Sequence, residues 1–235
     1  MDVAATPVRY LVRVWLPDRP GALGQVASRI GAAKGDVVGI EILERGAGRV
    51  IDEIVVELAS PALVELLVRE INEVDGVDVE EVRAADDAAL DPWLDALESA
   101  ARLVGFKSGD EVIATLCSLA HRAAGAVWSV VVHLETGEII TAEGQAPKAA
   151  WIEAFIAGSR HAARSGEVLT DAKDVTWVPL PARNLALILG REGTAFRAKE
   201  RRQAAALARI ADAWLGALFR ERRLQCRLAH PCNAR

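Results

Sequence analysis

A six-residue loop, Asp18–Leu23, most constrains the fold of this chain, because it joins a strand-like segment to an amphipathic helix. The preceding residues 8–16 are rich in β-branched and aromatic side chains and mostly alternate with polar ones, which predicts a half-buried strand. Beyond Gly21 the apolar residues recur at helical spacing. Asp18 is predicted to accept hydrogen bonds from the first amides of this helix, and Pro20 suits a helix start. Gly21 leaves the backbone open to close approach, and bare amides at a helix N-terminus attract carboxylates.

The residues that follow predict a recognisable order of elements. Gly35 is expected to end the first helix in a left-handed cap. Two strands over residues 37–43 and 50–58 form a hairpin with a glycine-bearing turn. A second amphipathic helix leads to a fourth strand over residues 77–82. The order β-α-β-β-α-β is the ferredoxin-like arrangement.

This order resembles the ACT domain, a regulatory module that binds amino acids. The resemblance rests on the loop sequence DRPGAL and on the segment GDVVGIEI at the second strand, and it covers residues 8–85. ACT domains usually bind a free amino acid between the loop after strand one and the start of strand two, often across a dimer interface. The resemblance therefore implies ligand binding by Asp18, Arg19, Pro20, Gly21, Ala22, Leu23, Asp36, Val37, Val38 and Gly39.

Two acidic residues depart from the usual pattern of this family. Asp18 and Asp36 stand where ligand-binding members often have asparagine, and Leu16 stands where a histidine can occur. Two carboxylates would attract the ammonium group of an amino acid and repel its carboxylate, so backbone amides are expected to hold the anion. The alternative is that the loop is a helix-start turn without a ligand and that the domain only dimerises.

Length and composition predict two domains in a chain of 235 residues that is 51% hydrophobic and 26% charged. Residues 1–85 carry 9 basic and 15 acidic side chains, which argues against a nucleic-acid surface there. A polar, acidic connector ends in a helix-starting Asp91-Pro92 pair. The predicted division is an ACT-like domain over residues 1–87, a second domain over 88–225 and a mobile tail over 226–235.

The predicted location is the cytoplasm. The chain begins without a charged leader and apolar core, and no apolar run reaches the length of a membrane span. Cys117, Cys226 and Cys232 do not make a disulfide framework, which fits a reducing compartment. Five lysines against 23 arginines suggest a GC-rich bacterial genome.

The second half predicts an α+β domain with an antiparallel sheet. Its expected elements are a helix at 110–124, a hairpin at 127–142, a helix at 151–163, short strands at 168–170, 176–180 and 185–189, and a closing helix at 195–223. This order, with the phrase Gly193–Phe196 before the closing helix, is similar to a GAF-like sensor domain. The resemblance implies a pocket on the sheet face covered by residues 144–175.

The closing helix has an apolar stripe and many arginines. Leu207, Ala211, Trp214 and Leu218 recur at three-four spacing, which predicts either a seam between subunits or a core-facing side. The basic side chains are interpreted as a solvated face, since no recognition-helix motif supports nucleic-acid binding.

No set of residues predicts catalysis, a metal site or a cofactor. His121, His133 and His161 are widely separated along the chain, and His121 and His161 are expected at the surface. Cys226, His230 and Cys232 are too few to form a zinc site. Phosphate-binding, dinucleotide-binding and nucleophile-elbow motifs are also missing.

The sequence therefore predicts a non-catalytic, homodimeric regulatory protein that binds an amino acid at the ACT dimer interface. Binding would change the dimer allosterically and be passed to the second domain. Two alternatives stay open: an assembly scaffold without a ligand, and an enzyme whose second domain uses chemistry that the sequence does not identify.

Overall fold

The computed structural model describes residues 7–85, 90–165 and 174–229. The chain divides into two compact units, Met1–Ala96 and Leu97–Arg235, and both combine helices with an antiparallel sheet. The short strand predicted at residues 168–170 lies outside the described residues.

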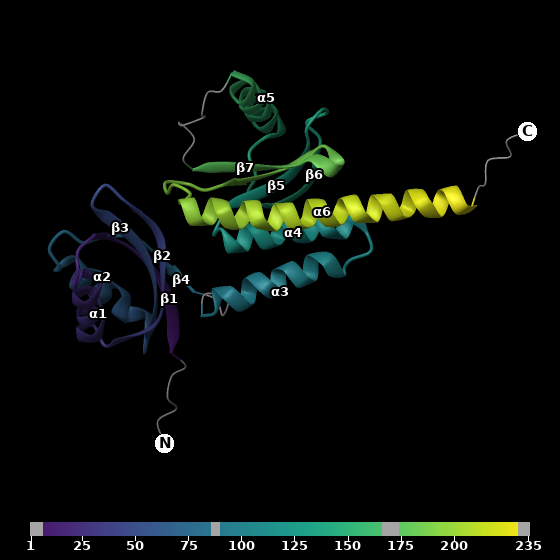
Figure 1. The fold of residues 1–235 in the computed structure, drawn as a ribbon. Helices are drawn as coiled ribbons and strands as arrows, with labels where there is room; N and C mark the ends of the chain where they lie inside the picture. Colours follow the sequence, from purple (N-terminus) through teal and green to yellow (C-terminus); the bar gives the residue numbers. More distant parts are fainter. Residues whose placement is uncertain (1–6, 86–89, 166–173, 230–235) are drawn as a thin grey trace, which may run out of the picture. The chain divides into compact units, whose positions relative to one another are not determined.

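The first unit is a four-stranded antiparallel sheet in the order β2-β3-β1-β4, with two helices on one face (Figure 1). Its elements are β1 (Val8–Pro17), α1 (Ala22–Ala32), β2 (Gly35–Gly46), β3 (Arg49–Leu58), η1 (Pro61–Leu63), α2 (Val64–Asn72) and β4 (Asp78–Ala84). Because β3 lies between β1 and β2, the unit has the predicted ferredoxin-like topology.

Alternation along the strands determines which side chains enter the core of this unit. On β1, Val12, Val14 and Leu16 face the helices and are at most 2% exposed. The apolar stripes of α1 and α2 cover them, as the helical spacing predicts. The helix side chains that are fully enclosed are Val26, Ile30, Leu67 and Ile71.

Two turns of the first unit depend on left-handed backbone. Ala47 and Gly48 have φ values of 51° and 74°, so the β2–β3 hairpin closes with a two-residue turn that matches the twist of its strands. At the end of α1 the left-handed residue is Lys34, with φ 61°, and the predicted cap at Gly35 is wrong. Gly35 is small for another reason, because an added Cβ would lie 2.9 Å from Cγ1 of Val56.

The connector leads into α3 (Pro92–Gly105), where the Asp91 carboxylate accepts a hydrogen bond of 3.0 Å from the Leu94 amide. The later elements are α4 (Gly109–Ala123), β5 (Trp128–His133), β6 (Ile139–Gly144), α5 (Ala149–Ser165), β7 (Val175–Leu180), η3 (Pro181–Arg183), β8 (Leu185–Gly190) and α6 (Ala198–Ala229). The four strands form an antiparallel sheet in the order β6-β5-β8-β7.

Helices cover both faces of this second sheet. Figure 1 shows α4 and α6 on one face and α5 on the other. Every residue of β8 is buried, as expected for a central strand with two covered faces. On α6, Leu207 and Ala211 belong to the core on the α4 side, so the apolar stripe faces the core of its own unit rather than a seam between subunits. The helix also continues past the predicted end at residue 223 to Ala229.

Candidate functional site

The loop between β1 and α1 delivers the chain to the N-terminus of α1. Gly21 is the N-cap residue, with φ 86° in the left-handed region, and no side chain caps the helix. The predicted capping role of Asp18 is therefore wrong. Its backbone amide instead donates a hydrogen bond of 2.9 Å to the carbonyl of Gly48 in the hairpin turn.

Three amides at this helix end are without an acceptor among the described residues. They belong to Gly21, Leu23 and Gly24, whereas the Ala22 amide donates to the Arg19 carbonyl at 3.3 Å. Gly21 and Gly24 are exposed, and an added Cβ at either would meet nothing within 4 Å. Bare amides and the positive end of the helix dipole favour an anion such as a carboxylate here.

The second half of the predicted site, Asp36–Gly39, lies at the opposite end of the sheet within one copy of the chain. Asp36 pairs with Glu57 of β3, while Pro17, next to the loop, pairs with Arg49. The eight residue-to-residue steps from Arg49 to Glu57 span about 27 Å of extended chain. One copy therefore does not bring the ten predicted residues together.

Individual side chains of the predicted set also have different environments. Asp18, Arg19, Pro20 and Gly21 are exposed, whereas the Ala22 side chain is 3% exposed and belongs to the core. Leu23 packs partly against the same core. Ala22 can contribute only its backbone to a ligand.

On β2 the predicted side chains alternate in exposure. Asp36 and Val38 are exposed, while Val37 packs against the helix-side core and Gly39 is half-buried. The strand is an edge of its sheet, so its outer backbone groups have no neighbouring strand in the chain.

Sequence analysis missed Asp52, an acidic residue on β3. It pairs with Val14 of β1 and Ile42 of β2, between the core residues Val50 and Ile54. This register places its side chain on the helix-covered face, and it is 3% exposed. The available signal was the alternation of residues 50–58, which puts an aspartate in an otherwise apolar series.

The carboxyl group of Asp52 has no hydrogen-bond donor among the described residues, and its Oδ1 atom is fully enclosed. Burial raises its pKa above the usual 3.8; the positive charge of Arg45 opposes this shift and the negative charge of Asp18 adds to it. The negative charge of Asp18, in the loop between β1 and α1, therefore acts on the carboxyl group of Asp52.

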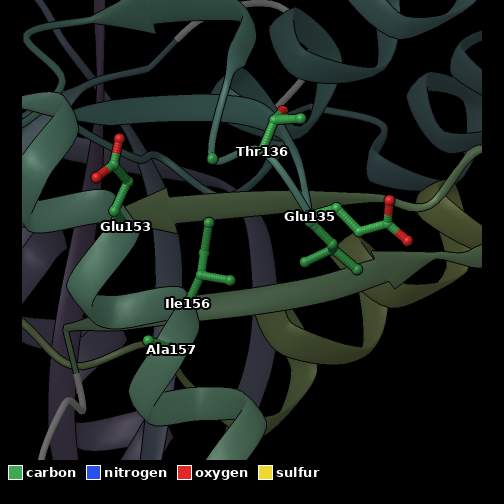
Figure 2. A pocket seen from close by; sticks show the side chains of 7 residues that line it. Glu135, Thr136, Glu153, Ile156 and Ala157 are labelled. Carbon is green, nitrogen blue, oxygen red and sulfur yellow. The ribbon is translucent and has the colours of Figure 1, made fainter.

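A shallow hollow of about 240 Å³ lies in the second unit, between the β5–β6 turn and α5. Figure 2 shows Glu135 and Glu153 on opposite sides of it, with Ile156 between them. It adjoins the sheet face where the GAF-like resemblance implies a pocket. Its carboxylates do not converge on one point, so it lacks the arrangement of a defined ligand site.

Cys117 and His121 are one helical turn apart on α4. The Cys117 thiol lies 3.1 Å from the Ser129 hydroxyl, and burial raises its pKa to about 11. His121 is half-buried and its Nδ1 is enclosed without a partner among the described residues, so the predicted surface position is wrong. A thiol with this pKa stays protonated at neutral pH and is a poor nucleophile.

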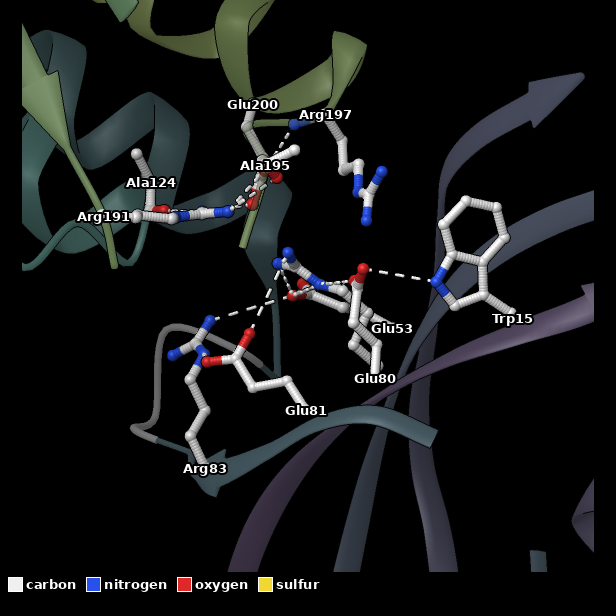
Figure 3. A network of polar contacts seen from close by, with 11 residues as sticks. Trp15, Glu53, Glu80, Glu81, Arg83, Ala124, Arg191, Ala195, Arg197 and Glu200 are labelled. Carbon is white, nitrogen blue, oxygen red and sulfur yellow. Dashed lines mark hydrogen bonds and ion pairs between the residues drawn. The ribbon is translucent and has the colours of Figure 1, made fainter. Parts of the chain in front are cut away.

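Charged side chains form one network in each unit (Figure 3). In the first, Arg13 donates to Glu53 at 3.1 Å from Nε, and Trp15 donates to Glu80 at 3.2 Å. In the second, Arg191 pairs with Glu200, whose carboxylate also accepts a hydrogen bond of 2.6 Å from the Arg197 amide at the start of α6. The paired charges hold structural elements together rather than leaving a group free for chemistry.

Within the part of the chain that the structure describes, no three His, Cys, Asp or Glu side chains are arranged to hold a metal ion. Among the described helices, none combines the length and apolar character needed to cross a membrane. His230 and Cys232, two of the three tail residues that are too few for a zinc site, lie outside the described residues.

Comparison with known proteins identifies the first unit. Residues 10–76 match the family model of the ACT domain. The ACT domain of GTP pyrophosphokinase from Chlorobium tepidum is similar at 16% identity, covering 34% of this chain and 100% of its own, with a TM-score of 0.28. The C-terminal domain of the MgtC protein from Mycobacterium tuberculosis is similar at 21% identity, covering 37% and 96% of the two chains, with a TM-score of 0.29.

A bacteriophytochrome from R. palustris is similar over more of the chain. The match covers 78% of this chain and 48% of the bacteriophytochrome, at 11% identity and a TM-score of 0.35. A likeness at this level assigns no family to the second unit, whose GAF-like resemblance stays a prediction. No protein of curated function matches the chain.

Proposed function

We propose that this chain, whose residues 10–76 form an ACT domain, is a non-catalytic regulatory protein that binds an amino acid between two copies of its first unit. The observation that carries the proposal is the exposed N-terminus of α1, where the amides of Gly21, Leu23 and Gly24 have no acceptor among the described residues. A ligand carboxylate would satisfy these amides.

Dimerisation through β2 is the second part of the proposal. β2 is an edge strand, and Val38, Ile40 and Ile42 on it are 37, 47 and 42% exposed. Edge strands with exposed apolar side chains tend to pair with another chain, and two-fold dimers are the commonest assemblies.

Antiparallel pairing of two β2 strands would unite the two halves of the predicted site. In such a pair the start of one strand lies beside the end of the other. The end of β2 at Gly46 adjoins the loop of its own copy, because Gly46 pairs with Arg49 and Arg49 with Pro17. Asp36 of one copy would then come close to Asp18 of the other, and the site would form twice per dimer.

The proposed regulation requires that the ligand binds the dimer more tightly than the single chain. An amino acid held by both copies stabilises one subunit arrangement by its differential affinity, and the connector after β4 passes this change to the second unit. The raised pKa of Cys117 makes this thiol a poor candidate for a nucleophile, since a buried protonated thiol is inert.

Ligand binding is tested by thermal shift with each of the twenty amino acids. At least one is expected to raise the Tm of the wild-type chain, and Gly21→Leu is expected to abolish the response. Leucine is strained at φ 86°, and its side chain would cover the bare amides. Gly193→Leu is the matched control, because Gly193 has φ 79° and equally open surroundings in the second unit. An unchanged response in Gly21→Leu contradicts the proposed site.

Dimerisation is tested by sedimentation of wild type and Ile40→Lys. The substitution puts a charge on the exposed edge and is expected to give monomers with a weakened amino-acid response. Ile140→Lys is the control, since Ile140 is 41% exposed on the edge strand β6 of the other sheet. A dimer that responds to no amino acid favours the scaffold alternative, for which the exposed edge of β2 is the supporting observation. Turnover in a broad substrate screen would favour the enzyme.

A further inference from the structure

Asp52 is a buried acidic residue whose Oδ1 atom has no hydrogen-bond donor among the described residues. Its neighbours on both sides along β3, Val50 and Ile54, belong to the apolar core under α1 and α2. An apolar residue would fill this position without the cost of an enclosed carboxyl oxygen that lacks a donor. The position therefore carries a cost that a bound donor group would remove.

The surroundings of Asp52 identify the chemistry of that group. Asp18 lies close enough to add negative potential, and the bare amides of α1 lie at the same end of the sheet. Arg45 supplies opposing positive potential from β2 but forms no ion pair with Asp52. Two carboxylates beside a set of amide donors match a small molecule with one cationic and one anionic end.

A divalent cation fits these surroundings less well. Such ions take six or more oxygen ligands, commonly several carboxylates, and no acidic cluster of that kind occurs among the described residues. A primary ammonium group needs three acceptors, which Asp52, Asp18 and a carbonyl or water can supply.

We propose that Asp52 binds the α-ammonium group of the amino acid, while the amides of Gly21, Leu23 and Gly24 hold its carboxylate. This proposal rests on the proposed function. It adds Asp52, which lies on β3, to a site that otherwise consists of the β1–α1 loop and β2. Asp52 selects for a free amine, so hydroxy acids and Nα-acylated amino acids are excluded.

The test compares wild type, Asp52→Asn and a control by calorimetry and thermal shift. The probes are the twenty amino acids and their Nα-acetyl derivatives, each added singly to the full chain. Asp52→Asn is expected to lower the affinity for the responding amino acid by about 10- to 100-fold, the range of a hydrogen bond between charged groups. Glu65→Gln removes one exposed negative charge on α2 and is expected to leave the affinity unchanged.

The outcomes separate the two proposals. No response of the wild type to any amino acid overturns the proposed function and the role of Asp52 with it. An amino acid that binds Asp52→Asn as tightly as wild type overturns the role of Asp52 alone. Equal binding of the free and Nα-acetylated forms by wild type does the same, and this measurement holds even if Asp52→Asn fails to fold.

Discussion

Substitution of Asp52 by asparagine should stabilise the unliganded first unit at neutral pH. Asparagine has nearly the shape of aspartate but no charge to desolvate. The enclosed Oδ1 atom is a single unsatisfied acceptor, a class of defect that costs about 1–3 kcal/mol. The amide remains polar, and the wild-type charge is partly compensated by Arg45, so a gain of about 1 kcal/mol is expected.

The pH dependence of this gain has a definite sign. Because the pKa of Asp52 is raised in the folded state, the folded state holds this proton more tightly than the unfolded state does. The stability that this group contributes to wild type is therefore full below its ordinary value of 3.8 and is lost as pH rises through the raised value. The difference between Asp52→Asn and wild type should be near zero in acid, grow above pH 3.8 and then level off.

Hydrogen exchange of the amides in residues 50–58 measures this difference in the first unit alone. Wild type, Asp52→Asn and Glu65→Gln are compared across the pH range, with exchange rates corrected for their intrinsic pH dependence. Glu65→Gln reports the effect of removing any one negative charge. Faster exchange in Asp52→Asn than in wild type at neutral pH, or a difference that does not change with pH, would refute the assignment of Asp52 as a buried acid without a hydrogen-bond donor.

Two further predictions concern the second unit. The pKa of Cys117 is raised to about 11, so alkylation of this thiol by iodoacetamide at pH 8 should be far slower in the folded chain than in urea. Mass spectrometry of the peptide that contains Cys117 measures both rates. Equal rates would contradict the burial of the thiol. Gly190→Ala should lower the Tm of the second unit in calorimetry, because the added Cβ would lie 2.0 Å from Cε2 of Trp128. Gly158→Ala on α5 is the control and should leave the Tm unchanged, because an added Cβ there meets nothing within 4 Å.

The element order of the first unit could be predicted because each element has its own local signal. The alternation of β1 and the spacing of Val26 and Ile30 on α1 are set by neighbours in sequence. Helix ends were less predictable, since Lys34 and Gly35 are both compatible with a left-handed turn. Packing decided between them, because an atom at Gly35 would meet Val56 on another strand.

The site was less predictable because its assembly depends on long-range pairing. The family resemblance names Asp18 and Asp36 together, but the register puts them at opposite ends of one sheet. Asp52 was missed because its significance comes from what surrounds it. An aspartate in a strand is ordinary when it faces solvent, and only the pairing of β3 with β1 puts this one in the core.

A site divided between two copies makes binding and assembly depend on each other. If the amides of one copy and Asp36 of the other hold the same amino acid, the factor by which dimerisation raises affinity equals the factor by which the ligand strengthens the dimer. Asp52 adds to this linkage, because Arg45 compensates its charge only in part and a bound ammonium group would complete the compensation. Asp52 would thus lower the free energy of unfolding of the first unit when no ligand is bound. In the bound dimer the same residue would raise it, because the ligand's ammonium group pairs with the carboxylate.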